Sequence, residues 1–296
     1  MKRNHILMGL GFSLLITFFM MLGCTKDDSI IPQNNQQIEP RGYSTIIGTG
    51  INTIFYGLSS KNELVRYKAG PPAQLVSSIQ MVGLTADEHM MAIDFRPSNG
   101  RLYGVSDLSM LYLIDPGTGM VKPMSAIPFE PAIKGLTVGF DFDPIVDQIR
   151  LVTDLDQNMR LDPDLGKVIS IDNDLVPAES SINAIAYSRL FNPSRTFPLY
   201  DIDVTSGKLF KQEPNSGKLE FIGLLGLVIN GEGGFDIGAN ATSGLAVLYG
   251  HSRLGGVVNG DNLLTDACRV YEINLLSGKT LYKGKLDRNI IGIAIQ

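Results

Sequence analysis

The sequence contains no tryptophan, three histidines and only two cysteines, Cys24 and Cys268. Because Cys24 has another role, given below, no pair remains for a disulfide framework, and we interpret Cys268 as a small buried apolar side chain. The chain also lacks any run of clustered lysine and arginine, and its formal net charge is −5. Nucleic-acid binding needs a concentrated basic surface, so we expect no nucleic-acid partner.

Helical periodicity is missing as well. After residue 23, no window keeps apolar residues at the i, i+3, i+4, i+7 spacing over three turns. The sequence also contains no P-loop, no dinucleotide-binding glycine fingerprint and no Gly-x-Ser-x-Gly elbow. These absences remove the common signatures of nucleotide-binding and α/β-hydrolase enzymes, and the missing helical pattern predicts an all-β fold.

What is present is a string of short strands separated by tight turns, clearest at residues 139–171. The segments GFDF, QIRLV, NMRL and KVISI are rich in apolar and β-branched residues, which favour strands. Asp-Pro pairs at Asp143 and Asp162 open two turns, and Gly166 supplies a residue that tolerates positive φ. This stretch predicts a four-stranded antiparallel meander.

Variants of the meander recur at a period of about 45–58 residues, close to the period of β-propeller blades. The first strand recurs as AIDF (92–95), GFDF (139–142), AIAY (184–187), FDI (235–237) and GIAI (292–295). The last set is split, because its other three strands begin near Thr53; such a split closes a ring and leaves no open sheet edge. We predict a five-bladed β-propeller closed by pairing of N- and C-terminal strands, with six blades as the alternative if residues 221–228 hide another strand pair.

The N-terminus has a different character. A basic start, MKRNH, precedes an apolar run from Ile6 to Gly23, and Leu22 and Gly23 come directly before Cys24. This arrangement resembles a bacterial lipoprotein signal peptide, which implies cleavage after residue 23 and attachment of a lipid such as palmitate to Cys24. A single transmembrane anchor is the alternative. Residues 24–46 are polar and are interpreted as a lipidated tether, and residues 47–296 as the propeller domain.

Lys26, Asp27 and Asp28 follow the lipidation site. They resemble the export signal of surface lipoproteins in the Bacteroidetes. The resemblance implies a lipid-anchored location on the bacterial outer membrane, at the cell surface, with the membrane as a partner through the lipid on Cys24.

The segments YGLSSKNELVRY (56–67) and VTDLDQNMRLDPDLGKV (152–168), with Asp-Phe-x-Pro turns between them, carry a second resemblance. They are similar to the bacterial domain-of-unknown-function family numbered 4394, over residues 53–296. The resemblance implies propeller-like repeats in an exported protein and no particular activity. Two insertions, at residues 188–196 and 251–268, depart from the repeat pattern.

One face of a propeller carries the loops that lead into the innermost strands and the loops between the second and third strands, and binding sites are usual there. Residues just before the innermost strands are expected to ring the channel mouth: His89, Leu136, Asn183, Gly234 and Asn289. The second-to-third-strand loops contribute Asp107, Asp154 and Asn158, whose side chains also commonly cap turns. The candidate binding residues are therefore His89, Asp107, Asp154, Asn158, Arg160, Asn183 and Asn289.

Two of these candidates have a competing interpretation. His89 is of the residue type used as an acid, a base or a metal ligand near neutral pH. No second histidine or cysteine lies at metal-ligand spacing, so a solvated loop residue is the competing interpretation. Arg160 suits a carboxylate ligand and equally suits a structural lock on Asp154 or Asp156, and the lock is the favoured interpretation.

Asp94, Asp141 and Asp143 lie on or at the end of innermost strands. Carboxylates facing each other across a channel serve glycoside hydrolysis or bind calcium. Their recurrence in the repeat instead favours a role in every blade. We therefore assign no catalytic residue, no metal ligand and no cofactor.

These observations favour a surface-exposed, lipid-anchored propeller that acts as a binding or interaction module for an unknown protein or glycan ligand, and a non-enzymatic role. The alternative is a carbohydrate- or lactone-directed hydrolase or lyase that uses channel carboxylates, with or without calcium. An enzyme requires at least two acids, or an acid and His89, to converge on one position in the channel. A purely structural envelope protein is the third possibility.

Overall fold

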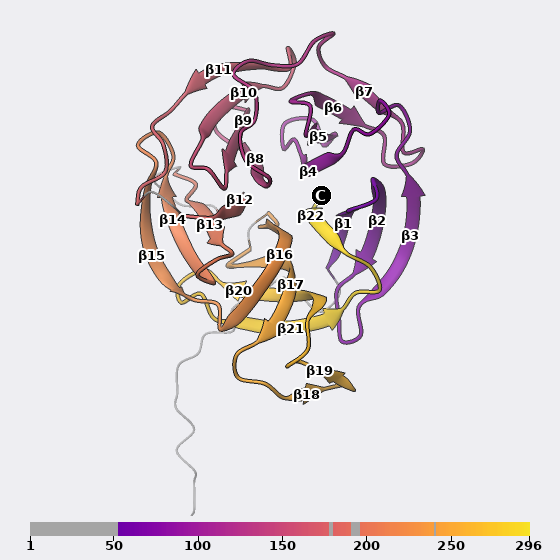
Figure 1. Cartoon of the computed structure of the whole chain (residues 1–296), viewed down its shortest axis with the longest axis vertical. Coiled ribbons are helices and arrows are strands. Elements are labelled where there is room, and N and C mark those ends of the chain that lie inside the picture. The colour runs from indigo at the N-terminus through magenta and orange to yellow at the C-terminus, as the bar shows by residue number, and fades with distance from the viewer. Residues whose placement is uncertain (1–52, 178–179, 191–195, 240) are drawn as a thin grey trace, which may run out of the picture. The chain divides into compact units, whose positions relative to one another are not determined.

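The computed structural model describes residues 53–177, 180–190, 196–239 and 241–296 (Figure 1). The signal peptide, Cys24, the tether and the first residues of the predicted domain lie outside this part of the chain. The described residues all belong to one compact unit, Ser44–Gln296. Within them, no helix is long and apolar enough to cross a membrane.

The described regular structure consists of β-strands, which form five four-stranded antiparallel sheets and one two-stranded sheet. Blade 1 consists of β22 (Ile290–Ala294), β1 (Ile54–Ser59), β2 (Glu63–Lys68) and β3 (Gln74–Gln80). Blade 2 consists of β4 (Met90–Phe95), β5 (Leu102–Ser106), β6 (Leu111–Ile114) and β7 (Val121–Pro123). Blade 3 consists of β8 (Val138–Asp143), β9 (Gln148–Thr153), β10 (Asn158–Asp162) and β11 (Lys167–Ile171).

The remaining two blades follow in chain order. Blade 4 consists of β12 (Ile182–Tyr187), β13 (Leu199–Asp203), β14 (Lys208–Glu213) and β15 (Lys218–Leu224). Blade 5 consists of β16 (Leu227–Asp236), β17 (Ser243–Ser252), β20 (Ala267–Asn274) and β21 (Thr280–Lys285).

The five blades form a closed ring around a central channel (Figure 1). Each innermost strand contacts the next one around the ring, in the order β4, β8, β12, β16, β22 and back to β4. The ring closes through β22, which pairs antiparallel with β1 and places Ala294 opposite Tyr56 and Ile293 opposite Gly57. The five-bladed prediction and its closure are confirmed. Residues 221–228 hold the end of β15 and the start of β16 and add no sixth blade.

The core lies between blades rather than within them. Tyr103 of β5 and Phe142 of β8 meet edge to face with their ring centroids 5.3 Å apart. Phe55 of β1 and Val270 of β20 belong to another buried cluster that joins blades 1 and 5. Because each sheet is covered on both faces by its neighbours, strands such as β5 and β12 are buried along their whole length. Cys268 is buried in this core, as expected.

Close packing of the innermost strands depends on glycine where β16 meets β22. A Cβ atom at Gly234 would clash with the backbone of Gly292 and Ile293. The glycine-rich residues 231–238 have the composition of a loop but lie mostly inside β16. The pairing of β16 with β17 shifts register between Ile229 and Gly233, and this irregularity changes the direction of the strand just before it enters the channel.

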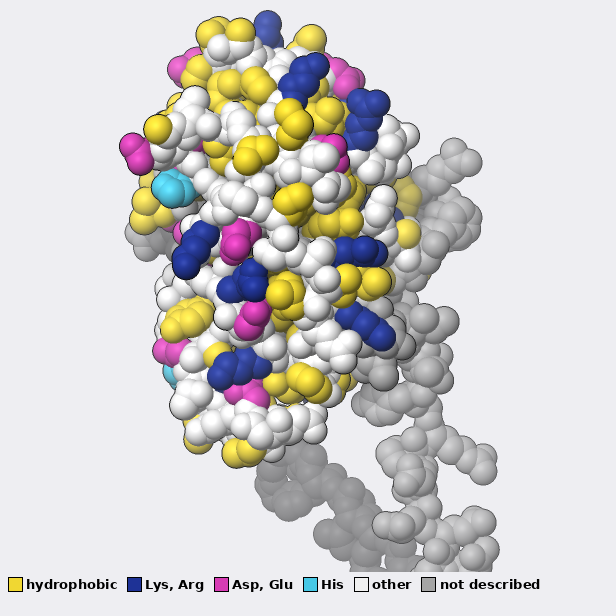
Figure 2. Space-filling model, turned by 90° about the vertical axis from the view of Figure 1, so that its right-hand side faces the viewer, with side chains coloured by type: hydrophobic (Ala, Val, Ile, Leu, Met, Phe, Trp, Pro, Cys, Tyr) yellow, Lys and Arg dark blue, Asp and Glu magenta, His cyan; other side chains and the backbone are white. Residues whose placement is uncertain are grey.

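The insertion at residues 251–268 forms a hairpin from β18 (Val257–Val258) and β19 (Asp261–Asn262). Arg269 is fully buried and fixes the hairpin through two bonds to the Asp261 carboxylate, the shorter of 2.7 Å. The insertion at residues 188–196 is only partly within the described residues. On the side of the molecule shown in Figure 2, basic and acidic side chains are interspersed with apolar ones.

Candidate functional site

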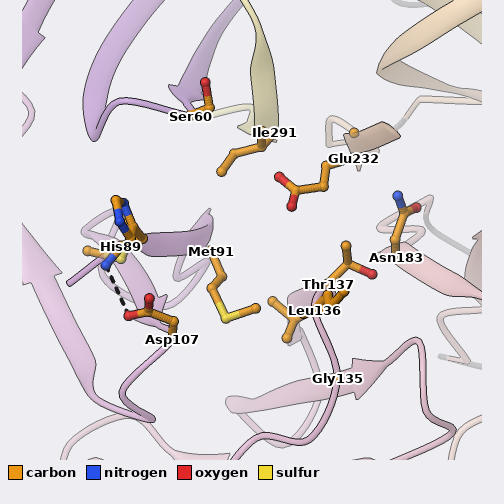
Figure 3. A pocket seen from close by; sticks show the side chains of 13 residues that line it. Ser60, His89, Met91, Asp107, Gly135, Leu136, Thr137, Asn183, Glu232 and Ile291 are labelled. Atoms are coloured by element: carbon orange, nitrogen blue, oxygen red, sulfur yellow. Dashed lines mark hydrogen bonds between the residues drawn. The ribbon is translucent and has the colours of Figure 1, made fainter. Parts of the chain in front are cut away.

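The channel opens on one face of the ring in a pocket of about 350 Å³, which we call the mouth pocket (Figure 3). Every blade contributes to it. The pocket is lined by Ser60, His89, Met90, Met91, Asp107, Gly135, Leu136, Thr137, Val138, Asn183, Glu232, Gly233 and Ile291. Met91, Leu136 and Ile291 give it apolar walls, and the other exposed groups are polar, which is the usual make-up of a small-ligand site.

His89 is held at the mouth by the loop that leads into β4. The buried Glu88 carboxylate accepts hydrogen bonds from the Thr85 nitrogen (3.0 Å) and from the Tyr112 hydroxyl (2.7 Å). The Asp107 carboxylate accepts a hydrogen bond of 3.0 Å from the His89 backbone nitrogen (Figure 3). These bonds fix the backbone, while the imidazole ring has no hydrogen-bond partner among the described residues.

Asn183 lies on the opposite side of the mouth, near the start of β12 (Figure 3). Its side chain is almost completely buried, at 2% exposure of the residue, yet neither its amide oxygen nor its amide nitrogen has a partner among the described residues. The Thr137 hydroxyl is also buried without a partner there. Buried polar groups in folded proteins nearly always have hydrogen bonds, and leaving one unpaired costs about 1–3 kcal/mol.

Glu232 extends toward the middle of the opening, between Ile291 and Asn183 (Figure 3). It lies within the irregular segment of β16, where the register with β17 shifts between Ile229 and Gly233. Burial raises the pKa of the Glu232 carboxyl above its usual value, and the negative charge of Asp154 raises that pKa further. No described residue donates a hydrogen bond to this carboxylate. Its charge therefore has no protein partner at the mouth.

A second hollow of about 370 Å³ adjoins the mouth pocket and shares Leu136, Thr137, Asn183 and Glu232 with it. Asp154 lines this hollow and accepts hydrogen bonds from the backbone nitrogens of Leu136 (2.9 Å) and Thr137 (3.2 Å). Asp154 thus positions the blade 3 side of the mouth and adds negative charge beside it.

Farther along the innermost strands, the channel narrows to a free volume of about 10 Å³. The narrow segment is lined by side chains and backbone one or two residues beyond the mouth, including Ile93, Phe140, Ile185, Phe235 and Ile293. A cavity of this size holds about one water molecule. A sugar or other organic ligand at the mouth therefore cannot pass farther down the channel.

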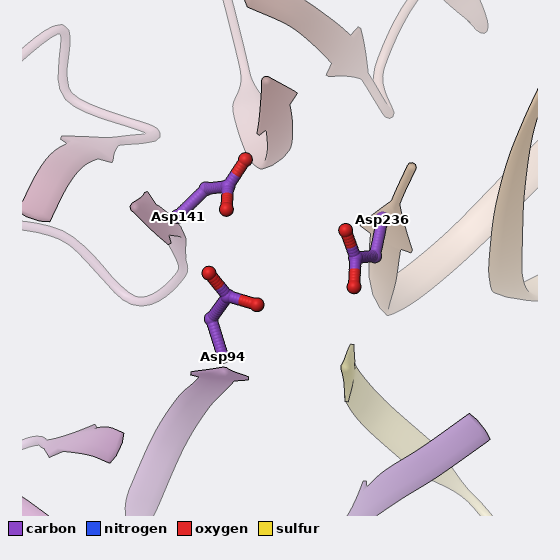
Figure 4. Close-up of side chains that lie close together, drawn as sticks. All are labelled: Asp94, Asp141 and Asp236. Carbon is purple, nitrogen blue, oxygen red and sulfur yellow. The ribbon is translucent and has the colours of Figure 1, made fainter. Parts of the chain in front are cut away.

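Below the narrow segment lies the floor triad, which consists of Asp94, Asp141 and Asp236 (Figure 4). The three carboxylates are buried, and one oxygen of each lies within 4.8 Å of one oxygen of the others. Within the described part of the chain, the floor triad is the one group of three or more potential ligand side chains that lie close enough together to hold a metal ion. Asp143, which we considered with Asp94 and Asp141 from the sequence, caps its own turn by accepting from the Ile145 nitrogen at 2.8 Å.

Each carboxylate of the floor triad joins its own blade to the next one. Asp94 accepts hydrogen bonds from its neighbour Phe95 (2.7 Å) and from Phe142 of blade 3 (3.0 Å). Asp236 accepts from Ile237 (2.5 Å) and from Ile295 at the end of blade 1 (2.6 Å).

Asp141 makes the same pair of bonds, from Phe142 (2.7 Å) and from the Tyr187 nitrogen of blade 4. These backbone bonds explain the position of all three carboxylates without an ion. The recurrence of aspartate in the repeat therefore serves contacts between blades.

Burial is the main cause of altered acidity in the floor triad. It raises the pKa of Asp141 to about 7 and that of Asp236 to about 7, and it raises the pKa of Asp94 well above its usual range. The charge of Asp141 raises the pKa of Asp94 further, and Arg189 acts in the opposite direction on all three.

The structure separates the seven predicted binding residues into three groups. His89, Asp107 and Asn183 line the mouth pocket, and Asp154 lines the adjoining hollow. Asn289 is exposed and lines neither, although its carbonyl accepts a hydrogen bond of 3.2 Å from Ser60.

Asn158 and Arg160 belong to a network between blades 3 and 4. Asn158 is buried, accepts from Arg150 (2.8 Å) and donates to the Pro214 carbonyl (2.8 Å). Arg160 is a structural lock, but its partner is Asp172, at 2.9 and 3.0 Å, and not Asp154 or Asp156. The sequence offered no signal for this pairing, because Arg160 lies on β10 and Asp172 lies just after the end of β11, and the register of these two strands could not be foreseen.

Three residues of the mouth were not among the candidates from the sequence: Glu232, Thr137 and Met91. Thr137 and Met91 follow Leu136 and His89 closely, so the predicted loops led to the correct part of the chain. Glu232 lies between Gly231 and Gly233, and this glycine-rich segment suggested a loop. A lone acid among glycines just before the FDI segment of an innermost strand was the signal that could have identified it.

Residues 63–294 match the family described as Domain of unknown function (DUF4394). The chain belongs to this family. No curated protein matches the sequence. The solved structures similar to the DUF4394 chain include the crystal structure of a nidogen/laminin complex, with 11% identity, a TM-score of 0.48 and coverage of 82% of this chain and 97% of that one.

A second similar structure is that of an auxiliary nutrient binding protein from Bacteroides ovatus ATCC 8483. It has 12% identity, a TM-score of 0.38 and coverage of 57% of this chain. The DUF4394 chain spans 46% of the length of that protein. The family assignment rests on the match over residues 63–294 alone.

Proposed function

We propose that this DUF4394 propeller is a binding module whose ligand is a small polar molecule, or the end of a larger one, held in the mouth pocket. The observation that carries the proposal is Asn183, whose buried amide has no partner among the described residues although it lines a pocket of about 350 Å³. A ligand that supplies both a donor and an acceptor would remove the cost of that unpaired group.

The scaffold around Asn183 supports binding without rearrangement. The loop before β4 is pinned through Glu88 and Asp107, and the loop before β8 is pinned through Asp154. A pocket whose walls are fixed before the ligand arrives loses little conformational entropy on binding. The mouth pocket is therefore preorganised.

A hydrolase or lyase is the second candidate, favoured by the raised pKa of the floor-triad carboxyls, which suits a general acid. Two observations weigh against it. The triad lies below a segment of about 10 Å³, too narrow for a sugar or lactone. At the mouth, Glu232 and His89 lie on different sides of the opening (Figure 3). Binding is the function that the geometry supports best.

The experiment is a ligand screen on the full chain in detergent, read by thermal shift and then by titration, with neutral monosaccharides, nucleosides and amino acids as probes. For any probe that binds, Asn183→Ala is expected to weaken the affinity about tenfold, the value of one good hydrogen bond. Asn289→Ala is the matched control, because Asn289 is exposed beside the mouth without lining it. Binding that is equally sensitive to both changes, or to neither, contradicts the proposal.

We further propose that a lipid on Cys24 anchors the domain to the bacterial outer membrane and that residues 24–46 hold it away from the surface. The support is the signal-like sequence of residues 1–23 and the Lys-Asp-Asp segment after the cysteine. Labelling of cells with an alkyne-tagged palmitate is expected to tag the wild-type chain and not Cys24→Ser. Protease added to intact cells is expected to remove the domain, and protection from the protease would place the domain on the inner side of the membrane.

A further inference from the structure

The charged side chains around the mouth have one sign. Asp107 lines the mouth pocket, Asp154 lines the adjoining hollow and Glu232 lines both. Among the described residues that line these two spaces, none is lysine or arginine, and His89 is the one side chain that can become positive. An anionic ligand would therefore meet repulsion and no charged donor.

The acids differ in how much of their hydrogen-bonding capacity is already used. Asp107 accepts from the His89 nitrogen, and Asp154 accepts from Leu136 and Thr137. Glu232 accepts from no described residue, although it is partly buried and points into the opening (Figure 3). Its carboxylate is thus free to accept two or more hydrogen bonds from a ligand.

A second, independent feature lies beside this acid. Asn183 is buried and unpartnered, and it lines both spaces together with Glu232. Its amide oxygen adds a neutral acceptor to the lining of the same two spaces. A primary ammonium group has three donors, so it can donate to both the Glu232 carboxylate and the Asn183 amide oxygen, whereas a hydroxyl group has one donor and can donate to only one of them. The Asn183 amide nitrogen is left to donate to an acceptor elsewhere on the ligand.

A bare metal ion fits less well. Within the described residues, the group of three or more potential ligands with suitable spacing is the floor triad, and the mouth has no such group. Hard cations such as calcium require six to eight oxygen ligands. The apolar walls from Met91, Leu136 and Ile291 instead suit the carbon skeleton of an organic molecule.

We propose that the mouth pocket selects small organic cations, with an ammonium group bound by the Glu232 carboxylate and the Asn183 amide oxygen and with the carbon skeleton against Met91, Leu136 and Ile291. This inference rests on the proposed function and specifies the ligand class of the same site. The Glu232 carboxylate is the group that favours a positively charged ligand over a neutral one. The Asn183 amide contributes to the affinity for charged and neutral ligands alike.

The test uses two sets of size-matched probes, titrated into the full chain in detergent by calorimetry. One set is cyclohexylamine, cyclohexanol and cyclohexanecarboxylate, and the other is glucosamine, glucose and glucuronate. In the set that binds, the amine is expected to bind about tenfold more tightly than the neutral member, because hydrogen bonds to a charged group are worth at least about 1.5 kcal/mol. The carboxylate member is expected to bind most weakly.

Substitution of Glu232 separates charge selection from binding itself. Glu232→Gln keeps the size of the side chain and is expected to reduce the advantage of the amine to less than about threefold while leaving the neutral member unchanged. Glu220→Gln on the exposed face of β15 is the matched control and is expected to change nothing. Heteronuclear NMR of Gly231 and Gly233 reports whether the Glu232→Gln chain is folded and where the probe binds.

The possible failures are distinct. Binding that depends on Asn183 but shows no preference for the amine, or shows a preference that survives Glu232→Gln, overturns the cation inference and leaves the proposed function standing. Tighter binding of the carboxylate members also overturns it. The absence of binding by every member of both sets and of the wider ligand screen overturns both proposals.

Discussion

The two ends of the channel use the same kinds of residue in opposite ways. At the floor, three buried aspartates accept backbone hydrogen bonds from their own blade and from the next. At the mouth, Glu232 and the buried Asn183 have no partner among the described residues. Both ends are lined by innermost strands of the same repeat, so the difference comes from which groups the neighbouring blade offers.

In a repeat protein, polar residues that hold the blades together can be distinguished from polar residues that bind a ligand. Asp94, Asp141 and Asp236 occupy the same position of the repeat in three blades, while Ala186 and Ala294 occupy it in the other two. Asn183 and Glu232 have no such counterparts. In this propeller, polar residues shared between blades hold the ring together, and polar residues that differ between blades are left available to a ligand.

Removal of one floor carboxylate is expected to have the largest effect on stability. Asp236→Ala leaves the buried nitrogens of Ile237 and Ile295 without the acceptor they share. At about 1–3 kcal/mol for each unpaired group, the free energy of unfolding is expected to fall by about 2–6 kcal/mol. Chemical denaturation measures this loss. A loss below about 1 kcal/mol would show that the carboxylate does not join blades 5 and 1.

The raised pKa values of the floor triad can be tested without a substitution, by measuring the free energy of unfolding as a function of pH. The pKa of Asp141 is raised to about 7 and that of Asp236 to about 7, mainly by burial, whereas an unfolded aspartate has a pKa of about 3.9. Between about pH 4 and 7 the folded chain therefore holds protons that the unfolded chain has released, and stability falls as pH rises. The expected slope is on the order of 1 kcal/mol per pH unit while one of these carboxyls titrates.

The paired carboxylates elsewhere act in the opposite direction. Hydrogen bonds from Arg160 and Arg150 lower the pKa of Asp172 despite its burial, and bonds from Arg269 lower the pKa of Asp261. The stability that they contribute is lost only as pH falls below about 4. The chain is therefore expected to be most stable at mildly acidic pH. Asp236→Asn is expected to flatten the slope above pH 4, and an unchanged slope would contradict the assignment to the floor triad.

Much of the fold could be predicted from the sequence, because a propeller repeats its information in every blade. The recurrence of AIDF and GFDF gave the innermost strands, and the split set at the two ends gave the closure through β22 and β1. The extent of one irregular strand, β16, could not be predicted in this way. The glycines around Glu232 obscured β16, since glycine disfavours strands in isolation and is required here by the close approach of β22.

The site was less predictable, because it depends on contacts between blades. Loop order was enough to bring His89, Asp107 and Asn183 to one pocket. The role of Asn158 depends on Arg150 and on the Pro214 carbonyl, which lie on another strand and another blade. Such partners decide whether the side-chain amide of an asparagine is hydrogen-bonded or unpaired. The pattern of residues along one sequence does not identify them.

Asn183 and Asn158 provide the finest comparison, because both are buried asparagines at the start of a strand. Asn183→Leu replaces an unpaired amide with an apolar group of similar size, so the free energy of unfolding is expected to stay constant or to rise by about 1 kcal/mol. Asn158→Leu removes three hydrogen bonds and is expected to cost at least about 2 kcal/mol. Urea denaturation of the two variants measures both. If Asn183→Leu were the more damaging change, Asn183 would serve the scaffold, and the distinction between floor and mouth would fail at the residue on which the proposed ligand site depends.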